Sequence, residues 1–242
     1  MLNSHWHQDH IFGNAIFAPE TEIYATTRTC EIMREKTPTD IVEFKKHWPE
    51  QLTEWAESAR MAKDETERLD FEDGVRFAQA IINTFPQVKM RLPDHTFTDR
   101  LEFKGTKRTI EFVTLGGGHS DSDAFLHLPA ERLIFTGDLL VVKTHPDLTY
   151  GHPRDWLAIL ANIKALDPIC LIPGHGEFGT VADVAAIEHY LNDLLRMAEK
   201  NARESGTAES AVALRPPSFT EDWNNAEAFG RNMTFLHEVV QQ

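Results

Sequence analysis

A dense group of metal-binding side chains stands near the start of the printed sequence. Three imidazoles, of His5, His7 and His10, and the carboxylate of Asp9 follow one another in the pattern HxHxDH. Packing in an apolar core does not require this pattern, whereas imidazole and carboxylate groups suit zinc or another first-row metal. The pattern constrains the fold, because two ions need more ligands than these residues supply and other segments have to reach the same place.

The spacing within this cluster predicts which side chains share an ion. His5 and His7 are two residues apart, so in extended backbone they point the same way and can hold one ion together. Asp9 and His10 follow where the chain turns, and they can reach a second ion.

Three further candidate ligands each come just after a short apolar strand and beside glycine. They are His119 after Thr109–Leu115, Asp138 after Leu133–Thr136, and His175 after Ile169–Ile172. Glycine lets the backbone turn tightly and approach a metal closely. Strand ends are rigid, so a precise site is best built there.

Together these motifs resemble the metallo-β-lactamase superfamily, whose ligand motifs run HxHxDH, His, Asp, His in this order. The resemblance covers residues 3 to about 176. It implies two Zn²⁺ ions, with Fe or Mn as alternatives, and it implies a role for each ligand. His5, His7 and His119 resemble the ligands of the first ion, Asp9, His10 and His175 those of the second, and Asp138 the carboxylate that bridges both.

The alternation of strands and helices predicts a layered α/β fold. The resemblance implies a four-layer αβ/βα sandwich, formed as a single domain over residues 1–242 with C-terminal helices at 181–242. In that fold, strands before HxHxDH build much of the first sheet. Only Met1, Leu2 and Asn3 precede Ser4, so we expect an incomplete N-terminal sheet whose exposed edge favours a homodimer.

Residues 28–85 differ in character from the rest of the chain. Charge is dense, Pro38 and Pro49 punctuate the run, and apolar residues recur at helical spacing. We therefore expect a helical insertion, including a charged helix over Thr53–Arg68, that flanks the cleft and sets specificity. A solvated face or a dimer contact is an equal alternative.

Periodicity and turn signals predict several other elements. They are a strand at Thr21–Ala25, a helix around Trp156–Ile163, a helix start at Thr180, a loop over Gly206–Pro217 and a last helix over Ala226–Val240.

The loop after Asp138 supplies candidate substrate contacts, because this loop borders the active-site mouth in the superfamily. They are Lys143, His145, Tyr150 and His152; ordinary loop roles are the alternative. Near His119, Asp121 and Asp123 could orient a ligand imidazole, and Asp123 could equally begin the next strand.

Two metal ions that share one water lower its pKa toward neutrality. The sequence therefore predicts a hydrolase whose metal-bridged hydroxide cleaves a small ester, thioester, lactone or lactam, with Asp9 orienting the hydroxide or taking its proton. Cysteine-type β-lactamases carry cysteine at the position of Asp138. The aspartate of this chain looks more like the glyoxalase II type. However, the glycine-rich segment typical of glyoxalase II does not follow it.

Two alternatives remain: a phosphodiesterase or nuclease of the same fold, and a metal-binding fragment without turnover. The net charge of −14 repels polyanions, so we expect a small-molecule substrate and no nucleic-acid partner. No apolar run approaches membrane-spanning length and no signal peptide is visible, so we expect no membrane partner and, by default, a cytoplasmic protein. Cys30 and Cys170 are interpreted as buried thiols and not as a disulfide.

Overall fold

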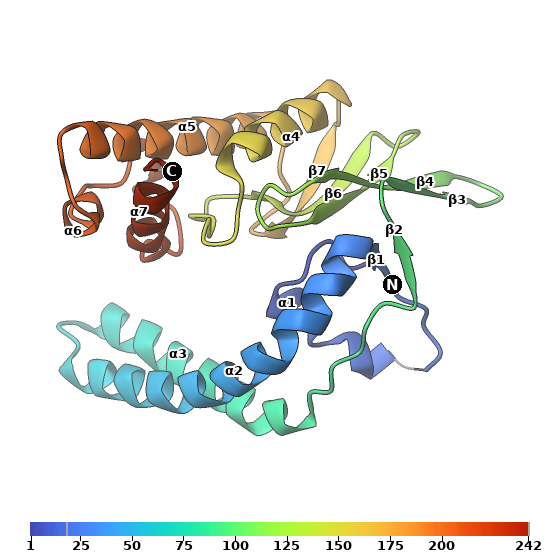
Figure 1. Ribbon diagram of the computed structural model, residues 1–242. Coiled ribbons are helices and arrows are strands. Elements are labelled where there is room, and N and C mark those ends of the chain that lie inside the picture. The colour runs from blue at the N-terminus through green and yellow to red at the C-terminus, as the bar shows by residue number, and fades with distance from the viewer. Residues whose placement is uncertain (18, 242) are drawn as a thin grey trace.

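Two β-sheets lie between layers of helices in the computed structural model, which describes residues 1–17 and 19–241 (Figure 1). The strands are β1 (Tyr24–Thr26), β2 (His95–Phe97), β3 (Arg100–Lys104), β4 (Thr109–Gly116), β5 (Asp123–Leu128), β6 (Leu133–Val141) and β7 (Cys170–His175). The α-helices are α1 (Gln8–Ile11), α2 (Thr27–Met61), α3 (Glu65–Thr84), α4 (Pro153–Ala165), α5 (Val181–Arg203), α6 (Ala208–Val212) and α7 (Ala228–Val239). Short 3₁₀ turns are η1 (Asn14–Phe17), η2 (Phe85–Gln87) and η3 (Ser218–Thr220).

The larger sheet has the order β3-β4-β5-β6-β7, with antiparallel neighbours except for the parallel pair β6–β7. Helices α4, α5 and α7 lie along one side of it (Figure 1). Their apolar faces share a buried core with the sheet, which includes Ile134, Leu139, Trp156, Leu160 and Leu191. Burial of this apolar surface is the main source of stability for this half of the molecule.

The smaller sheet pairs β1 with β2 in parallel, and Leu2 adds an isolated bridge to Tyr24. It packs toward the larger sheet through Phe97, whose ring centroid lies 5.0 Å from that of Phe112 in β4. On its other side, Ile32 and Met33 of α2 bury against Trp6 and Ile11. The order helix, sheet, sheet, helix is the predicted αβ/βα sandwich, with the expected small N-terminal sheet.

The predicted helical insertion at 28–85 is confirmed as a hairpin of α2 and α3. Pro38 and Pro49 do not interrupt it, since both lie inside the single helix α2. Proline removes a helical hydrogen bond and bends a helix, and α2 changes direction along its length in Figure 1. Packing against α3 holds the helix together across these positions, which local propensity does not foresee.

The expected continuous helix over Thr53–Arg68 is wrong. The chain turns after Met61, and Asp64 begins α3 by accepting a hydrogen bond from the Glu67 amide at 2.9 Å. This is an N-cap, which charge patterning alone does not distinguish from a helical aspartate.

Most other expected elements are present, with corrections. The capping signal at Thr180 is confirmed as a capping box with Asp183. The loop expected over Gly206–Pro217 contains α6, whose capping box joins Thr207 and Ser210. The first strand begins at Tyr24 and not at Thr21.

Cys30 is buried, as expected, whereas Cys170 is only half-buried, which corrects the expectation for that thiol; both cysteines are free. Among residues 1–17 and 19–241, no helix combines the length and apolar character that a membrane crossing requires.

Candidate metal centre

Segments from both halves of the molecule bring the candidate ligands to one place. The residues form two groups whose ligand atoms lie within 4.8 Å of one another in each group. The first group contains His5, His7, His119 and Asp138, and the second contains Asp9, His10, Asp138 and His175. Asp138 belongs to both groups. All the residues predicted as metal ligands are therefore gathered at this centre.

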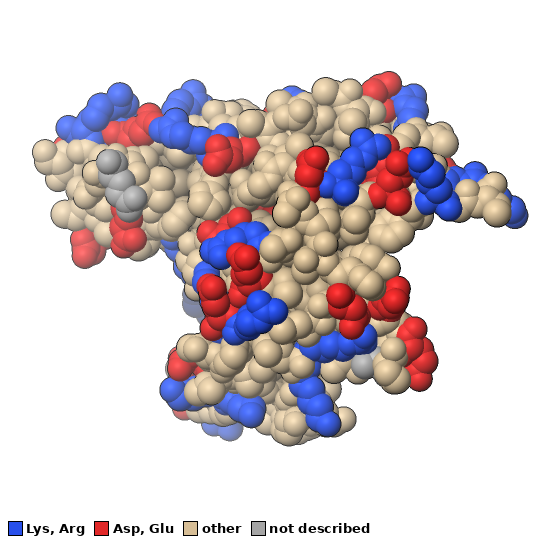
Figure 2. All heavy atoms as spheres, turned by 45° about the vertical axis from the view of Figure 1, so that its right-hand side comes forward, with Lys and Arg blue, Asp and Glu red and all other residues tan. Residues whose placement is uncertain are grey.

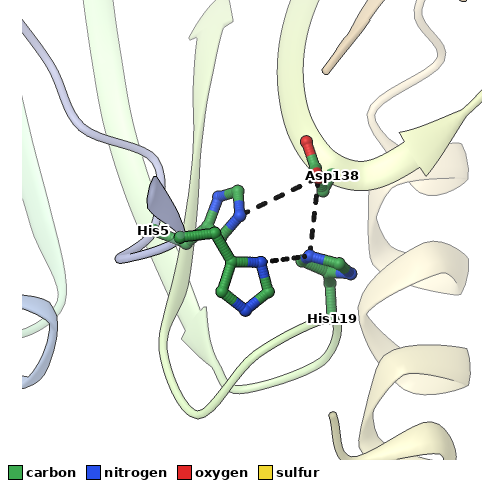
Figure 3. Close-up of side chains that lie close together, drawn as sticks. His5, His119 and Asp138 are labelled. Atoms are coloured by element: carbon green, nitrogen blue, oxygen red, sulfur yellow. Dashed lines mark hydrogen bonds and ion pairs between the residues drawn. The ribbon is translucent and has the colours of Figure 1, made fainter. Parts of the chain in front are cut away.

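In the first group, two imidazoles, those of His5 and His119, face the same oxygen of Asp138 (Figure 3). Asp138 Oδ2 lies 3.5 Å from His119 Nε2 and 3.9 Å from His5 Nε2. His119 Nε2 lies 3.0 Å from His7 Nδ1. As the two-residue spacing predicts, His5 and His7 point to the same side.

In the second group, Asp9 and Asp138 both face the same pair of imidazoles. His10 Nε2 lies 3.1 Å from Asp9 Oδ2 and 3.2 Å from Asp138 Oδ1. His175 Nε2 lies 3.0 Å from Asp9 Oδ2 and 3.5 Å from Asp138 Oδ2. The two oxygens of Asp138 therefore reach both groups.

These separations fit the ligand shells of metal ions. Tetrahedral ligands at zinc-like bond lengths of 2.0–2.2 Å lie about 3.4 Å from one another, and the pairs above span 3.0–3.9 Å. Within the described part of the chain, His5 Nε2 is buried without a hydrogen-bond partner. Such orphaned atoms are rare in native structures, and a cation at this point would satisfy it.

Four of the candidate ligand imidazoles have shifted pKa values, and these four divide into two pairs. Burial lowers the pKa of His5 and lowers that of His7 to about 3, so both are neutral, as metal ligands are. In the second group, ion pairs with Asp138 and Asp9 overcome burial and raise the pKa of His10 to about 9. Hydrogen bonding to Asp138 and Asp9 raises the pKa of His175 to about 10.

The carboxylates show the matching effect. Burial opposes ionisation of Asp9 and Asp138, but interactions with His10 and His175 hold the pKa of each below its ordinary value. Without a cation, two protonated imidazoles thus balance the two carboxylates. A divalent cation would replace those protons.

Two of the ligands lie within strands and not after them, which corrects the sequence prediction. Strand β6 continues through Asp138 to Val141, and β7 ends on His175 itself. The β6–β7 register shifts around Gly137, whose φ of +52° favours glycine. A Cβ on Gly137 would lie 2.7 Å from Ser4 Oγ, so this glycine also admits the segment that carries His5.

Asp123 organises the loop that carries His119. Its buried carboxylate accepts hydrogen bonds from the amides of Gly118 and Ser120, at 2.8 and 2.9 Å, and from the Ser120 hydroxyl. It also begins β5, the alternative that the sequence left open. Asp121 instead pairs with Lys36 and His152, so neither aspartate contacts a ligand imidazole.

A cavity of about 380 Å³ opens onto the centre. Its walls are His7, Asp9, His119, Asp138, Val141, Thr144, His145, Pro146, Asp147, His175 and Asn225. Sequence reasoning missed Thr144, Asp147 and Asn225, because they belong to no motif. Asn225 reaches the cavity only through the fold, and its Nδ2 donates to the His145 carbonyl at 3.0 Å.

The four candidate substrate contacts differ in their position relative to this cavity. Only His145 lines this cavity; its ring is buried, and its Nδ1 lies 2.9 Å from the Tyr190 hydroxyl. Tyr150 packs beside the centre, with ring centroids 5.2 Å from Trp6 and 6.2 Å from His7.

The other two candidates do not line this cavity. Lys143 is exposed and its Nζ lies 2.9 Å from Asp222 Oδ2. His152 precedes α4, and its Nε2 lies 3.3 Å from Asp121 Oδ1.

Known proteins share this fold over most of the chain. A metallo-beta-lactamase from Pontibacter korlensis superposes with a TM-score of 0.53 at 16% identity, covering 79% of this chain and 67% of that one. The inverting sec-alkylsulfatase Pisa1 from Pseudomonas sp. superposes with a TM-score of 0.65 at 14% identity, covering 98% of this chain and 40% of that one. At these identities the likeness concerns the fold.

Sequence comparison identifies the family. "Metallo-beta-lactamase type 2" from Bacteroides fragilis is 26% identical over 129 residues, which are 50% of this chain and 51% of the relative. The chain thus matches about half the length of this curated relative. The family model of the metallo-beta-lactamase superfamily matches residues 31–175, a range that contains His119, Asp138 and His175 and begins after HxHxDH. The chain therefore belongs to the metallo-beta-lactamase superfamily.

Proposed function

We propose that the chain is a binuclear, zinc-dependent hydrolase of a small ester, thioester, lactone or lactam. The observation that carries this proposal is the position of Asp138, whose carboxylate belongs to both ligand groups. A single carboxylate between two sets of imidazoles is the arrangement that holds two ions close together. His5, His7 and His119 would hold one ion, and Asp9, His10 and His175 the other.

Divalent ions in these positions would supply an acidified water and polarise the substrate's oxygen. The protein's own contribution includes Asp9, whose side chain is 55% exposed and lines the cavity. Its pKa is held below the ordinary value by His10 and His175, so it remains an ionised hydrogen-bond acceptor. We assign Asp9 the task of orienting the attacking water, since such a carboxylate is a weak base.

The cavity supports a small substrate. Its volume of about 380 Å³ lies near the lower end of the range of about 300–1,000 Å³ for small-molecule sites. His145, Thr144 and Asn225 offer polar groups along one wall, and Val141 and Pro146 offer apolar ones.

The chemistry at position 138 bears on the substrate. This residue is an aspartate, whereas cysteine-type β-lactamases have cysteine there, so we place carboxylic esters and thioesters ahead of lactams. Because relatives named above are β-lactamases, a lactam remains among the proposed substrates.

A substrate panel tests the proposal on the zinc-loaded protein. We expect hydrolysis of at least one of p-nitrophenyl acetate, a thioester, a lactone and a chromogenic cephalosporin, with activity lost in His7→Ala. His189→Ala is the matched control, because this histidine is exposed on α5 and activity should not change. Turnover of bis-p-nitrophenyl phosphate alone would favour the phosphodiesterase alternative, and metal binding without any turnover would favour the non-catalytic one.

A further inference from the structure

A second cavity, of about 290 Å³, lies between the HxHxDH segment and the helical hairpin. Its lining is largely apolar and comes from α1, α2, α3 and the turn after α3. The residues are Gln8, Asp9, Phe12, Gly13, Phe44, Trp48, Phe77, Ile81, Thr84, Phe85 and Val88. We name this cavity the hairpin pocket.

Aromatic contacts fix the hairpin pocket to the segment that carries the ligands. The ring of Phe12, which follows α1, lies 5.5 Å from those of Phe44 and Phe85. Phe44 and Phe85 are 4.6 Å apart, and Trp48 lies 5.4 Å from Phe77. Because α1 contains Asp9 and His10, the hairpin is positioned directly against the second ligand group.

The hairpin pocket is open and apolar. Phe77, one of its lining residues, is 55% exposed, although a large apolar side chain gains free energy when it is covered. Among the described residues that line it, Asp9 is the only charged one. An uncharged apolar group would cover these side chains, whereas an anionic group would meet the Asp9 carboxylate.

Asp9 connects the hairpin pocket to the reaction cavity, because it lines both. From this shared wall we infer that the hairpin pocket holds an apolar, uncharged portion of the substrate while the ligand groups hold the bond that is cleaved. The inference rests on the proposed function and narrows its substrate to those esters, thioesters, lactones or lactams that carry a sizeable hydrocarbon group.

The volume sets the size of that group. The hairpin pocket has about twice the volume of the roughly 150 Å³ cavity that accommodates benzene. An alkyl chain or fused aromatic ring of about ten carbon atoms fits this volume. A bulky side chain at Ile81, in the wall of the hairpin pocket, should exclude it.

Hydroxamates test this inference through binding, without reference to turnover, because the head group chelates metal and the tail can be varied. We expect octanohydroxamate to bind the zinc-loaded protein at least tenfold tighter than acetohydroxamate by calorimetry. Ile81→Trp should remove this gain and leave acetohydroxamate binding unchanged. Leu69→Trp is the matched control, since Leu69 is 45% exposed on α3 and outside the hairpin pocket, and it should keep the gain.

Each result has a defined meaning. Equal affinity of the two hydroxamates, or a gain that survives in Ile81→Trp, overturns the inference whatever the protein hydrolyses. Concentration-dependent dimerisation that is lost in Ile81→Trp also overturns it, because a second copy would then occupy the hairpin pocket. A tail-dependent gain in a protein that hydrolyses no member of the substrate panel supports the hairpin pocket and contradicts the proposed function alone.

Discussion

Gly174 lies directly against the carboxylate of Asp138, so closely that a Cβ at position 174 would overlap Asp138 Oδ1. The glycine belongs to β7 and the aspartate to the neighbouring strand β6. The absence of a side chain at 174 therefore leaves room for the residue that joins both ligand groups. This explains in steric terms why glycine immediately precedes His175.

Gly174→Ala should displace Asp138 and weaken binding of both ions. We expect a loss of metal affinity of at least about tenfold, the scale seen when groups that position metal ligands are removed. Titration with zinc in the presence of a competing chelator measures it. Gly13→Ala is the control, because a Cβ there meets nothing within 4 Å; equal affinities in the two variants would refute the steric argument.

Metal binding should release protons. His10 and His175 have raised pKa values of about 9 and about 10, so at pH 7.5 both are protonated before metal binds. Their conversion to neutral ligands releases up to about two protons per chain. Calorimetry in buffers of different ionisation enthalpy counts these protons, and a buffer-independent binding enthalpy would contradict the assignment of these two histidines.

The metal-free protein should lose stability as the solution becomes alkaline. A histidine whose pKa is raised by folding stabilises the folded state fully below the unfolded pKa of about 6.5. That contribution disappears as the pH rises through about 9 for His10 and about 10 for His175. The urea midpoint of the metal-free protein should therefore fall between pH 6.5 and 10, and fall less in His175→Gln; identical slopes would count against the ion pairs with Asp9 and Asp138.

Asp123→Ala should destabilise the fold and weaken the first ligand group. The substitution leaves the buried amides of Gly118 and Ser120 without their acceptor, which costs about 3 kcal/mol by the usual penalty for unsatisfied buried donors. Urea unfolding measures this loss, with the exposed Asp70→Ala on α3 as a control. A change below about 0.5 kcal/mol, typical of surface positions, would show that Asp123 does not organise the His119 loop.

The candidate ligands could be predicted from the sequence, because their residue types and spacing indicate metal binding. His5 and His7 converge as two residues of extended chain should, and His119 arrives at the end of its strand region as expected. The positions of Asp138 and His175 inside strands were not predictable, because the continuation of β6 depends on a shifted pairing with β7 at Gly137.

The helical insertion was predictable in type but not in detail. Periodicity around Phe44 and Ile81 indicates helices, yet Pro38 and Pro49 suggested breaks that packing against α3 overrides. The turn at Asp64 was not predicted, because a capping aspartate looks like any other charged residue within a charged helix. The hairpin pocket could not be predicted from the sequence, because it depends on contacts of Phe12 with Phe44 and Phe85, which are distant in the sequence.

The net charge of −14 is a sum over the whole chain and does not describe each part of its surface. Figure 2 shows acidic and basic side chains interspersed over one face of the molecule, so local surroundings differ from the average. The test with bis-p-nitrophenyl phosphate addresses this point directly, since that compound is an anionic phosphodiester.

Metal content is the most direct test of the central claim that Asp138 joins two ion sites. Elemental analysis of the zinc-loaded, desalted protein should give two equivalents per chain, and Asp138→Ala should retain one or fewer. His7→Ala should lose the first ion and keep the second, because His7 belongs only to the first group. A wild-type protein that binds no zinc, or an Asp138→Ala variant that still binds two equivalents, would contradict the account.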